Sequence, residues 1–155
     1  MRVIGTKRTG GSVAGVDKVY GPDETDEVLS QADYVVLLLP VTPKTENMFD
    51  AARLAKMKPS AWLINFARGG LIVDDDLIAA VKGKTIAGAI LDVFRTEPLH
   101  ASHPFWTTPG ISVLPHIGGG HPTRDRMVAS LFADNMRRYL AGEPLTEVVD
   151  RARGY

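Results

Sequence analysis

The chain has 155 residues, of which 18 are basic and 18 acidic, so its formal net charge is +0. This balance lacks the basic stripe expected of a nucleic-acid-binding protein. The chain contains no cysteine, which excludes disulfides and thiolate catalysis and makes a cytoplasmic setting the expectation. No signal peptide is visible. The longest apolar run, residues 34–39, is too short to span a bilayer, so we expect no membrane association.

Short apolar runs alternate with amphipathic segments along the chain. The apolar runs predict strands at residues 2–6, 16–20, 34–39, 61–66, 85–93 and 111–114. The amphipathic segments predict helices at residues 23–31, 45–57, 74–81 and 123–140. Asp23 is the expected N-cap of the first helix. The uniformly apolar run 34–39 indicates a strand buried on both faces, and the tail after Pro144 is expected to be loose.

This alternation of strand and helix predicts a doubly wound α/β fold, a parallel sheet with helices on both faces. Ligands of such sheets bind beyond the carboxyl ends of the strands. The informative side chains are therefore those that follow the predicted strands directly, and they lie at Lys7-Arg8, Pro40-Val41-Thr42, Ala67-Arg68-Gly69, Asp92 and His116.

Arg68, Glu97 and His116 follow three different predicted strands. An arginine binds a carboxylate through two hydrogen bonds, and a histidine titrates near neutrality and suits general acid–base chemistry. A carboxylate beside the histidine would stabilise its protonated form. Each residue also has an ordinary structural interpretation, because a surface arginine can cap a helix or pair with an acid, and a single histidine or glutamate is more often structural or merely solvated.

The chain resembles the D-isomer-specific 2-hydroxyacid dehydrogenase family in four motifs, which occur in the family's order from the first strand to about Val149. The motifs are LLPVTPKT at residues 38–45, MKPSAWLINFARGGLIVD at 57–74, GAILDVFRTEPL at 88–99 and PHIGG at 115–119.

The resemblance implies a role for each matching residue. Arg68 would hold the carboxylate and carbonyl of a 2-oxo acid, His116 would exchange a proton with the carbonyl oxygen, and Glu97 would orient His116. Asp92 would bind the nicotinamide carboxamide, together with the region of Ala67. The remaining implied cofactor contacts, which include the adenosine and phosphate side of the cleft, are Leu39, Pro40, Thr45, Phe66, Arg68, His116, Gly118 and Gly119. The hydride transfer itself is nicotinamide chemistry.

The chain also departs from the family pattern. The family's Gly-x-Gly-x-x-Gly loop, which cradles a pyrophosphate, has no counterpart, because Gly10, Gly11 and Gly15 do not match its spacing. We therefore expect a Rossmann-like domain that lacks its first central strand and the following helix. Residues 1–149 are expected to form this partial dinucleotide-binding domain and residues 150–155 a flexible tail, with the substrate domain absent. The run Gly118-Gly119-Gly120-His121 resembles a glyoxylate/hydroxypyruvate-reductase-like branch.

The end of the predicted strand 2–6 indicates the cofactor. NAD-preferring members place an acidic residue there, whereas this chain has Lys7, Arg8 and Thr9. Basic and hydroxyl groups suit the 2′-phosphate of NADP, so we expect NADP, with NAD as the alternative and a solvated basic loop as the ordinary interpretation. His100, His103 and His121 lack the compact spacing of a zinc site, and we expect no metal.

Three functions remain open at this stage. The first is an oxidoreductase fragment that interconverts a 2-oxo acid and a D-2-hydroxy acid and associates as a homo-oligomer such as a dimer. The second is a non-catalytic dinucleotide-binding module of the kind found in co-repressors that resemble this family. The third is a truncated product without a function of its own. Retention of Arg68, Glu97 and His116 favours the enzyme.

Overall fold

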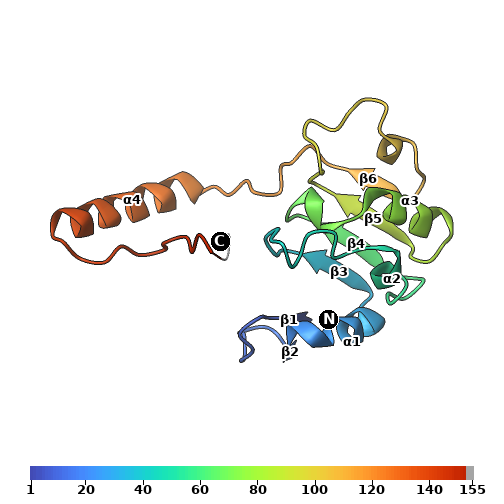
Figure 1. The fold of residues 1–155 in the computed structure, drawn as a ribbon, viewed down its shortest axis with the longest axis horizontal. Coiled ribbons are helices and arrows are strands. Elements are labelled where there is room, and N and C mark those ends of the chain that lie inside the picture. Colours follow the sequence, from blue (N-terminus) through green and yellow to red (C-terminus); the bar gives the residue numbers. More distant parts are fainter. Residues whose placement is uncertain (153–155) are drawn as a thin grey trace. The chain divides into compact units, whose positions relative to one another are not determined.

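The computed structural model describes residues 1–152, which form two compact units, Met1–Pro115 and a second that begins at His116. Figure 1 shows the elements of both units. The strands are β1 (Ile4–Thr6), β2 (Lys18–Tyr20), β3 (Tyr34–Leu37), β4 (Trp62–Asn65), β5 (Gly88–Leu91) and β6 (Ile111–Val113). The α-helices are α1 (Thr25–Gln31), α2 (Ala51–Leu54), α3 (Asp74–Lys82) and α4 (Arg124–Leu140), and single 3-10 turns lie at Pro22–Glu24, Gly69–Leu71 and Pro104–Trp106.

All strand pairs of the first unit are parallel, which confirms the predicted α/β, Rossmann-like class. The strands form two sheets, one of β1 and β2 and the other in the order β3-β4-β5-β6. Among the described residues β1 and β3 are not paired with each other, so each has one unpaired edge.

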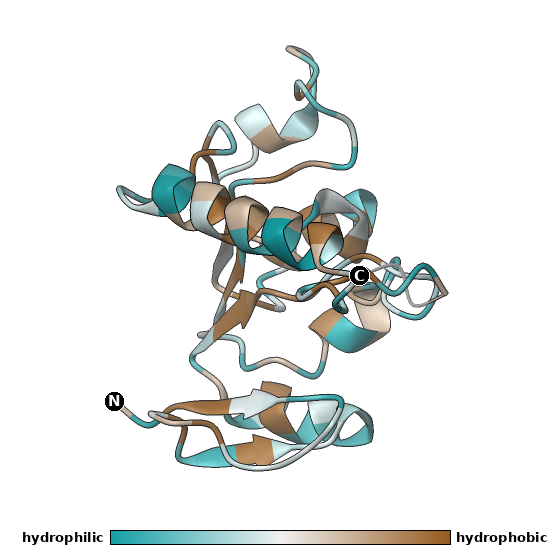
Figure 2. Ribbon diagram, turned by 90° about the vertical axis from the view of Figure 1, so that its left-hand side faces the viewer, coloured by the Kyte–Doolittle hydropathy of each residue, from teal (hydrophilic) through white to brown (hydrophobic). Residues whose placement is uncertain are grey.

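The core of the first unit lies on one face of the four-stranded sheet. Leu63 and Ala89 are fully buried neighbours in the register, and Leu77 of α3 and Leu54 of α2 belong to the same core. Figure 2 shows the brown, hydrophobic strands beside helices of mixed hydropathy. Burial of an apolar face in this way is the main stabilising contribution to such a fold.

The opposite face of β3 is exposed, contrary to the prediction from the sequence. The strand was expected to be buried on both faces, but its burial alternates, and Tyr34 and Val36 are 63% and 50% exposed. Successive side chains of a strand point to opposite faces, so this face of β3 is open to solvent.

The predicted helix at residues 45–57 is wrong, because only Ala51–Leu54 is helical. Phe49 pairs with Ile72 in an isolated parallel bridge, and its N–H donates to the Leu71 carbonyl at 2.9 Å. A residue in such a bridge needs an extended backbone. Asn47 has a positive φ of 54°, which also interrupts a right-handed helix. The helix begins only after Asp50, whose side chain accepts a hydrogen bond from the Arg53 N–H.

The other predicted elements are present with shifted ends. The strand predicted at 85–93 is confined to Gly88–Leu91, and the strand predicted at 34–39 ends at Leu37. Asp23 is not the N-cap of α1, because it lies inside the 3-10 turn Pro22–Glu24, which precedes that helix.

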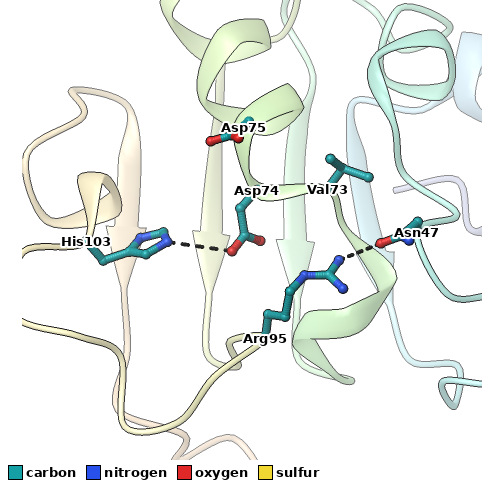
Figure 3. A pocket seen from close by; sticks show the side chains of 6 residues that line it. All are labelled: Asn47, Val73, Asp74, Asp75, Arg95 and His103. Carbon is teal, nitrogen blue, oxygen red and sulfur yellow. Dashed lines mark hydrogen bonds and ion pairs between the residues drawn. The ribbon is translucent and has the colours of Figure 1, made fainter.

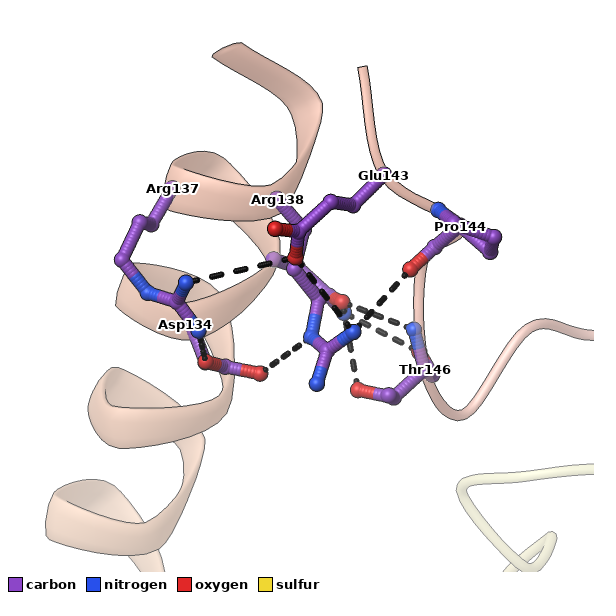
Figure 4. Close-up of polar contacts among 7 residues, drawn as sticks. Asp134, Arg137, Arg138, Glu143, Pro144 and Thr146 are labelled. Atoms are coloured by element: carbon purple, nitrogen blue, oxygen red, sulfur yellow. Dashed lines mark hydrogen bonds and ion pairs between the residues drawn. The ribbon is translucent and has the colours of Figure 1, made fainter. Parts of the chain in front are cut away.

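The second unit begins at His116 and contains α4 and the segment that follows this helix, part of which Figure 4 shows. The Asn135 side chain accepts from the Thr146 N–H at 2.9 Å and donates to the Thr146 carbonyl at 3.0 Å. Hydrogen bonds from Arg138 and Arg137 lower the pKa of Asp134 below its usual value. The tail is therefore attached to α4 as far as Thr146, which corrects the prediction that it is loose after Pro144. Of the tail predicted at 150–155, residues 153–155 lie outside the described part, and the predicted domain limit at Val149 stays a prediction.

Candidate functional site

Arg68 lies in the turn that follows β4, and the buried side chain of Asn65 shapes this turn. Asn65 is fully buried at the end of β4. Its Oδ1 accepts from the Ala67 N–H at 3.0 Å, and its Nδ2 donates to the Arg68 carbonyl at 3.0 Å. The exposed Arg68 side chain donates from Nη1 to the Ala67 carbonyl at 2.6 Å. The turn thus presents a guanidinium at the carboxyl end of a central strand.

Glu97 lies in the loop that follows the neighbouring strand β5, and this loop contacts the Arg68 turn. A Cβ atom added to Gly69 would lie 1.9 Å from the Phe94 carbonyl carbon, so the two backbones are in direct contact. Within the loop, Glu97 Oε1 accepts from the Phe94 N–H at 2.9 Å. The structure thus brings the loops of Arg68 and Glu97 together at one edge of the sheet.

Asp92 follows β5 directly and is 1% exposed. Its N–H donates to the Asn65 carbonyl at 3.0 Å, which places it beside the end of β4. Phe66, which is 37% exposed, and the buried Ala67 lie in the adjoining turn.

The turn after β3 carries the predicted cofactor residues Leu39, Pro40 and Thr45. Thr45 Oγ1 donates to the Pro40 carbonyl at 2.7 Å and accepts from the Thr42 N–H at 2.8 Å. These bonds close a compact hydroxyl-lined turn at the same sheet edge, because β3 and β4 are parallel neighbours. Gly70 connects this turn to the next loop through its carbonyl, which accepts from the Asn47 N–H at 2.9 Å.

Lys7, Arg8 and Thr9 follow β1, in the two-stranded sheet. All three are exposed, and the Lys7 N–H donates to the Tyr20 carbonyl at 3.0 Å, which continues the pairing of β1 with β2. The structure therefore places two cationic side chains just beyond the carboxyl end of β1.

A polar cluster that includes Arg95 of the Glu97 loop lines an open pocket of about 370 Å³, whose lining residues are Asn47, Val73, Asp74, Asp75, Arg95 and His103 (Figure 3). Arg95 Nη2 donates to Asn47 Oδ1 at 2.6 Å and to the Ile72 carbonyl. His103 Nε2 lies 3.6 Å from Asp74 Oδ2. Burial raises the pKa of Asp74 above its usual value, although Arg95 and His103 act in the opposite direction.

His116, Gly118 and Gly119 open the second compact unit, and His116 has a positive φ of 54°. The structure therefore brings together the loops of Arg68 and Glu97, and it describes His116 in a separate unit. The convergence of Arg68, Glu97 and His116 on one cleft stays a prediction, as do the individual roles of all the predicted site residues.

Sequence reasoning missed Asn65, Asn47 and Arg95. A polar residue inside the otherwise apolar strand 61–66 was a usable signal for Asn65, because a buried amide needs hydrogen-bonding partners. No signal was available for the pairing of Arg95 with Asn47, since these residues are 48 positions apart in the sequence.

No helix within residues 1–152 is long and apolar enough to cross a membrane. No group of three or more histidine, aspartate or glutamate side chains there is arranged to hold a metal ion.

The chain is similar to known proteins of one family. The family model for the D-isomer specific 2-hydroxyacid dehydrogenase NAD binding domain matches residues 1–118. A glyoxylate/hydroxypyruvate reductase A of Photorhabdus laumondii is 39% identical over 148 residues, which are 96% of this chain and 47% of the relative. A Corynebacterium melassecola protein of uncharacterised function is 38% identical over the whole chain and 51% of its own length. The chain thus spans about half the length of these curated relatives.

Solved structures agree with this match. A D-isomer specific 2-hydroxyacid dehydrogenase of Xanthobacter autotrophicus Py2, in complex with NADPH and MES, superposes with a TM-score of 0.90 at 38% identity. This alignment covers 99% of the chain and 62% of that structure. An NADPH-dependent glyoxylate/hydroxypyruvate reductase of Sinorhizobium meliloti, in complex with NADP and sulfate, gives 0.89 at 34% identity, over 99% of the chain and 49% of that structure.

Proposed function

Because the chain belongs to the D-isomer-specific 2-hydroxyacid dehydrogenase family, we propose that it is the dinucleotide-binding half of an oxidoreductase that transfers a hydride between NADPH and a 2-oxo acid. The product of reduction would be the D-2-hydroxy acid. Glyoxylate and hydroxypyruvate are the proposed substrate class, supported by the names of the relatives from Photorhabdus and Sinorhizobium.

The contact between the Arg68 and Glu97 loops carries this proposal. It places a guanidinium and a carboxylate at the same sheet edge, where Asp92 and the Thr42–Thr45 turn also lie. Arg68 would bind the substrate carboxylate with two hydrogen bonds. Glu97 would stabilise the protonated form of His116, which would deliver a proton to the carbonyl oxygen. NADPH would supply the hydride when bound.

NADP is the proposed cofactor because Lys7 and Arg8 follow β1 where an acidic residue would suit NAD. Lys7, Arg8 and Thr9 would bind the 2′-phosphate, and Pro40 and Thr45 would lie along the adenosine and phosphate side. A homo-oligomer is also part of the proposal, supported by the exposed apolar face of β3. A cytoplasmic setting is proposed from the absence of cysteine.

We expect negligible activity from the isolated 155-residue chain, because it spans only about half the length of its curated relatives and would lack the substrate contacts that the other half supplies. Lost positioning of this kind accounts for several kcal/mol of barrier, hence for orders of magnitude in rate. A chimaera that joins residues 1–155 to the complementary half of the Sinorhizobium reductase should reduce glyoxylate with NADPH. Replacing Arg68→Gln or His116→Gln in that chimaera should lower its kcat/KM by more than about 100-fold. A folded chimaera that is inactive, or that tolerates both replacements, would contradict the proposed function.

A further inference from the structure

Arg95 connects the Glu97 loop to two other loops at the carboxyl edge of the sheet. Its backbone lies between β5 and Glu97, and its side chain crosses to the Asn47 amide oxygen and the Ile72 carbonyl (Figure 3). We propose that Arg95 is a positioning residue that holds the Glu97 loop against the Arg68 turn. The consequence for catalysis rests on the proposed function.

Both acceptors of Arg95 are attached to the segment that follows Arg68. The Asn47 N–H donates to the Gly70 carbonyl at 2.9 Å, and the Ile72 N–H donates to the Gly69 carbonyl at 3.1 Å. Movement of the Arg95 guanidinium would therefore displace Gly69 and Gly70, the two residues that follow Arg68.

The backbone of Arg95 is also held in place, by its close contact with Gly69. A Cβ atom added to Gly69 would lie 2.2 Å from the Arg95 backbone nitrogen and 1.9 Å from the Phe94 carbonyl carbon. The Phe94 N–H in turn donates to the Glu97 carboxylate at 2.9 Å. Displacement of Arg95 would thus change both the packing on Gly69 and the donor that orients Glu97.

The chemistry of arginine suits this position. A guanidinium offers several N–H groups in a planar fork and serves two acceptors at once, whereas a lysine ammonium is a point charge on a flexible chain. The charge of Arg95 is balanced by Asp74, which it influences electrostatically, and by Glu46, whose Oε1 lies 4.0 Å from Nη1. Arg95 is also partly exposed, so its ion pairs contribute little to global stability, and its main effect is local.

The test uses the 155-residue chain with Arg95→Ala, Arg95→Lys and Asn47→Gly. Glycine keeps the positive φ of residue 47 and removes the amide acceptor. Lys58→Ala is the control, because it breaks the exposed 2.9 Å pair with Asp33, which involves none of these loops. Hydrogen exchange of the Asn47 and Phe94 amides reports on the loops, and NMR titration with oxamate, an analogue of a 2-oxo acid, reports on the anion site.

Arg95→Ala should accelerate exchange at both amides by about tenfold and weaken oxamate binding several-fold, with the urea midpoint nearly unchanged. Arg95→Lys should give a partial effect. Asn47→Gly should accelerate Phe94 exchange, and combining it with Arg95→Ala should add less than the sum of the two changes. The Lys58→Ala control should leave exchange and binding unchanged.

Unchanged exchange at both amides in Arg95→Ala would overturn the inference, as would equal changes in Lys58→Ala. Failure of oxamate to bind the unsubstituted chain would show that the anion site needs the complementary half of the enzyme, and the exchange rates then decide whether Arg95 holds the loops. The chimaera assay tests the proposed function separately.

Discussion

Gly69 and Phe94 approach so closely that a Cβ atom on Gly69 would lie 1.9 Å from the Phe94 carbonyl carbon. Only a residue without a side chain permits this contact between the Arg68 turn and the Glu97 loop. The glycine after Arg68 is therefore required by packing, and the separation of the two proposed functional side chains depends on it.

Gly69→Ala should lower the free energy of unfolding by about 2–4 kcal/mol, because backbone atoms must move to admit the methyl group. Gly70→Ala is the matched control, since its Cβ would meet the Val41 side chain at an ordinary 3.5 Å. Urea unfolding of both variants measures the difference. Equal stability of the two variants would show that the close contact is absent in solution.

The free energy of unfolding should depend on pH in the acidic range because of Asp74. Burial raises the pKa of Asp74 in the folded state, so the folded state binds the proton more tightly than the unfolded state. The stabilising contribution of the protonated form is present below the usual value of 3.8 and is lost as the pH rises through the higher folded pKa. Arg95, His103 and Asp75 all act on this group, so the shift is a net effect.

Asp74→Asn removes this titration. As the pH rises from below 3.8 through the higher folded pKa of Asp74, the stability of the unsubstituted chain should fall relative to that of Asp74→Asn and then stay level. Urea unfolding at a series of pH values measures the difference. A gain of the unsubstituted chain over the variant as the pH rises would mean that the pKa of Asp74 is lowered instead.

The open face of β3 should drive self-association. Tyr34 and Val36 expose apolar side chains on this face, beside an unpaired strand edge. Exposed apolar sheet surface of this kind favours association. Val36→Lys should shift the sedimentation of the chain toward the monomer, whereas Ser112→Lys on the distal strand β6 should have a smaller effect. A monomer at all concentrations of the unsubstituted chain would refute the proposed oligomer.

The sequence alone predicted the fold class, because four of the strands are short apolar runs between polar turns. It failed at residues 45–57, where the apolar pattern suits a helix but Phe49 instead pairs with Ile72. That contact joins residues far apart in the chain, and local propensity contains no information about it. The same limit applies to the site. Arg68 and Glu97 were accessible from their places after strands, but the Arg95–Asn47 contact depends on tertiary packing.

The basic turn after β1 should determine the choice of cofactor. Arg8→Glu should weaken NADPH binding by about tenfold or more and leave NADH binding nearly unchanged, because only NADPH carries the 2′-phosphate that a cation would contact. Lys56→Glu, at an exposed lysine that follows α2 and lies outside the proposed cofactor site, is a charge-matched control. Equal losses for the two cofactors, or for the two variants, would remove the basis for an NADP preference.

Titration of the ¹⁵N-labelled chain with NADPH and, in parallel, with NADH tests the central claim that this chain is the dinucleotide-binding half of an NADPH-dependent enzyme. We predict shifts in the amides of Lys7–Thr9, Leu39–Thr45, Phe66–Gly69 and Asp92, with NADPH binding more tightly than NADH. Shifts confined to other surfaces, or NADH binding as tightly as NADPH or more tightly, would contradict the account.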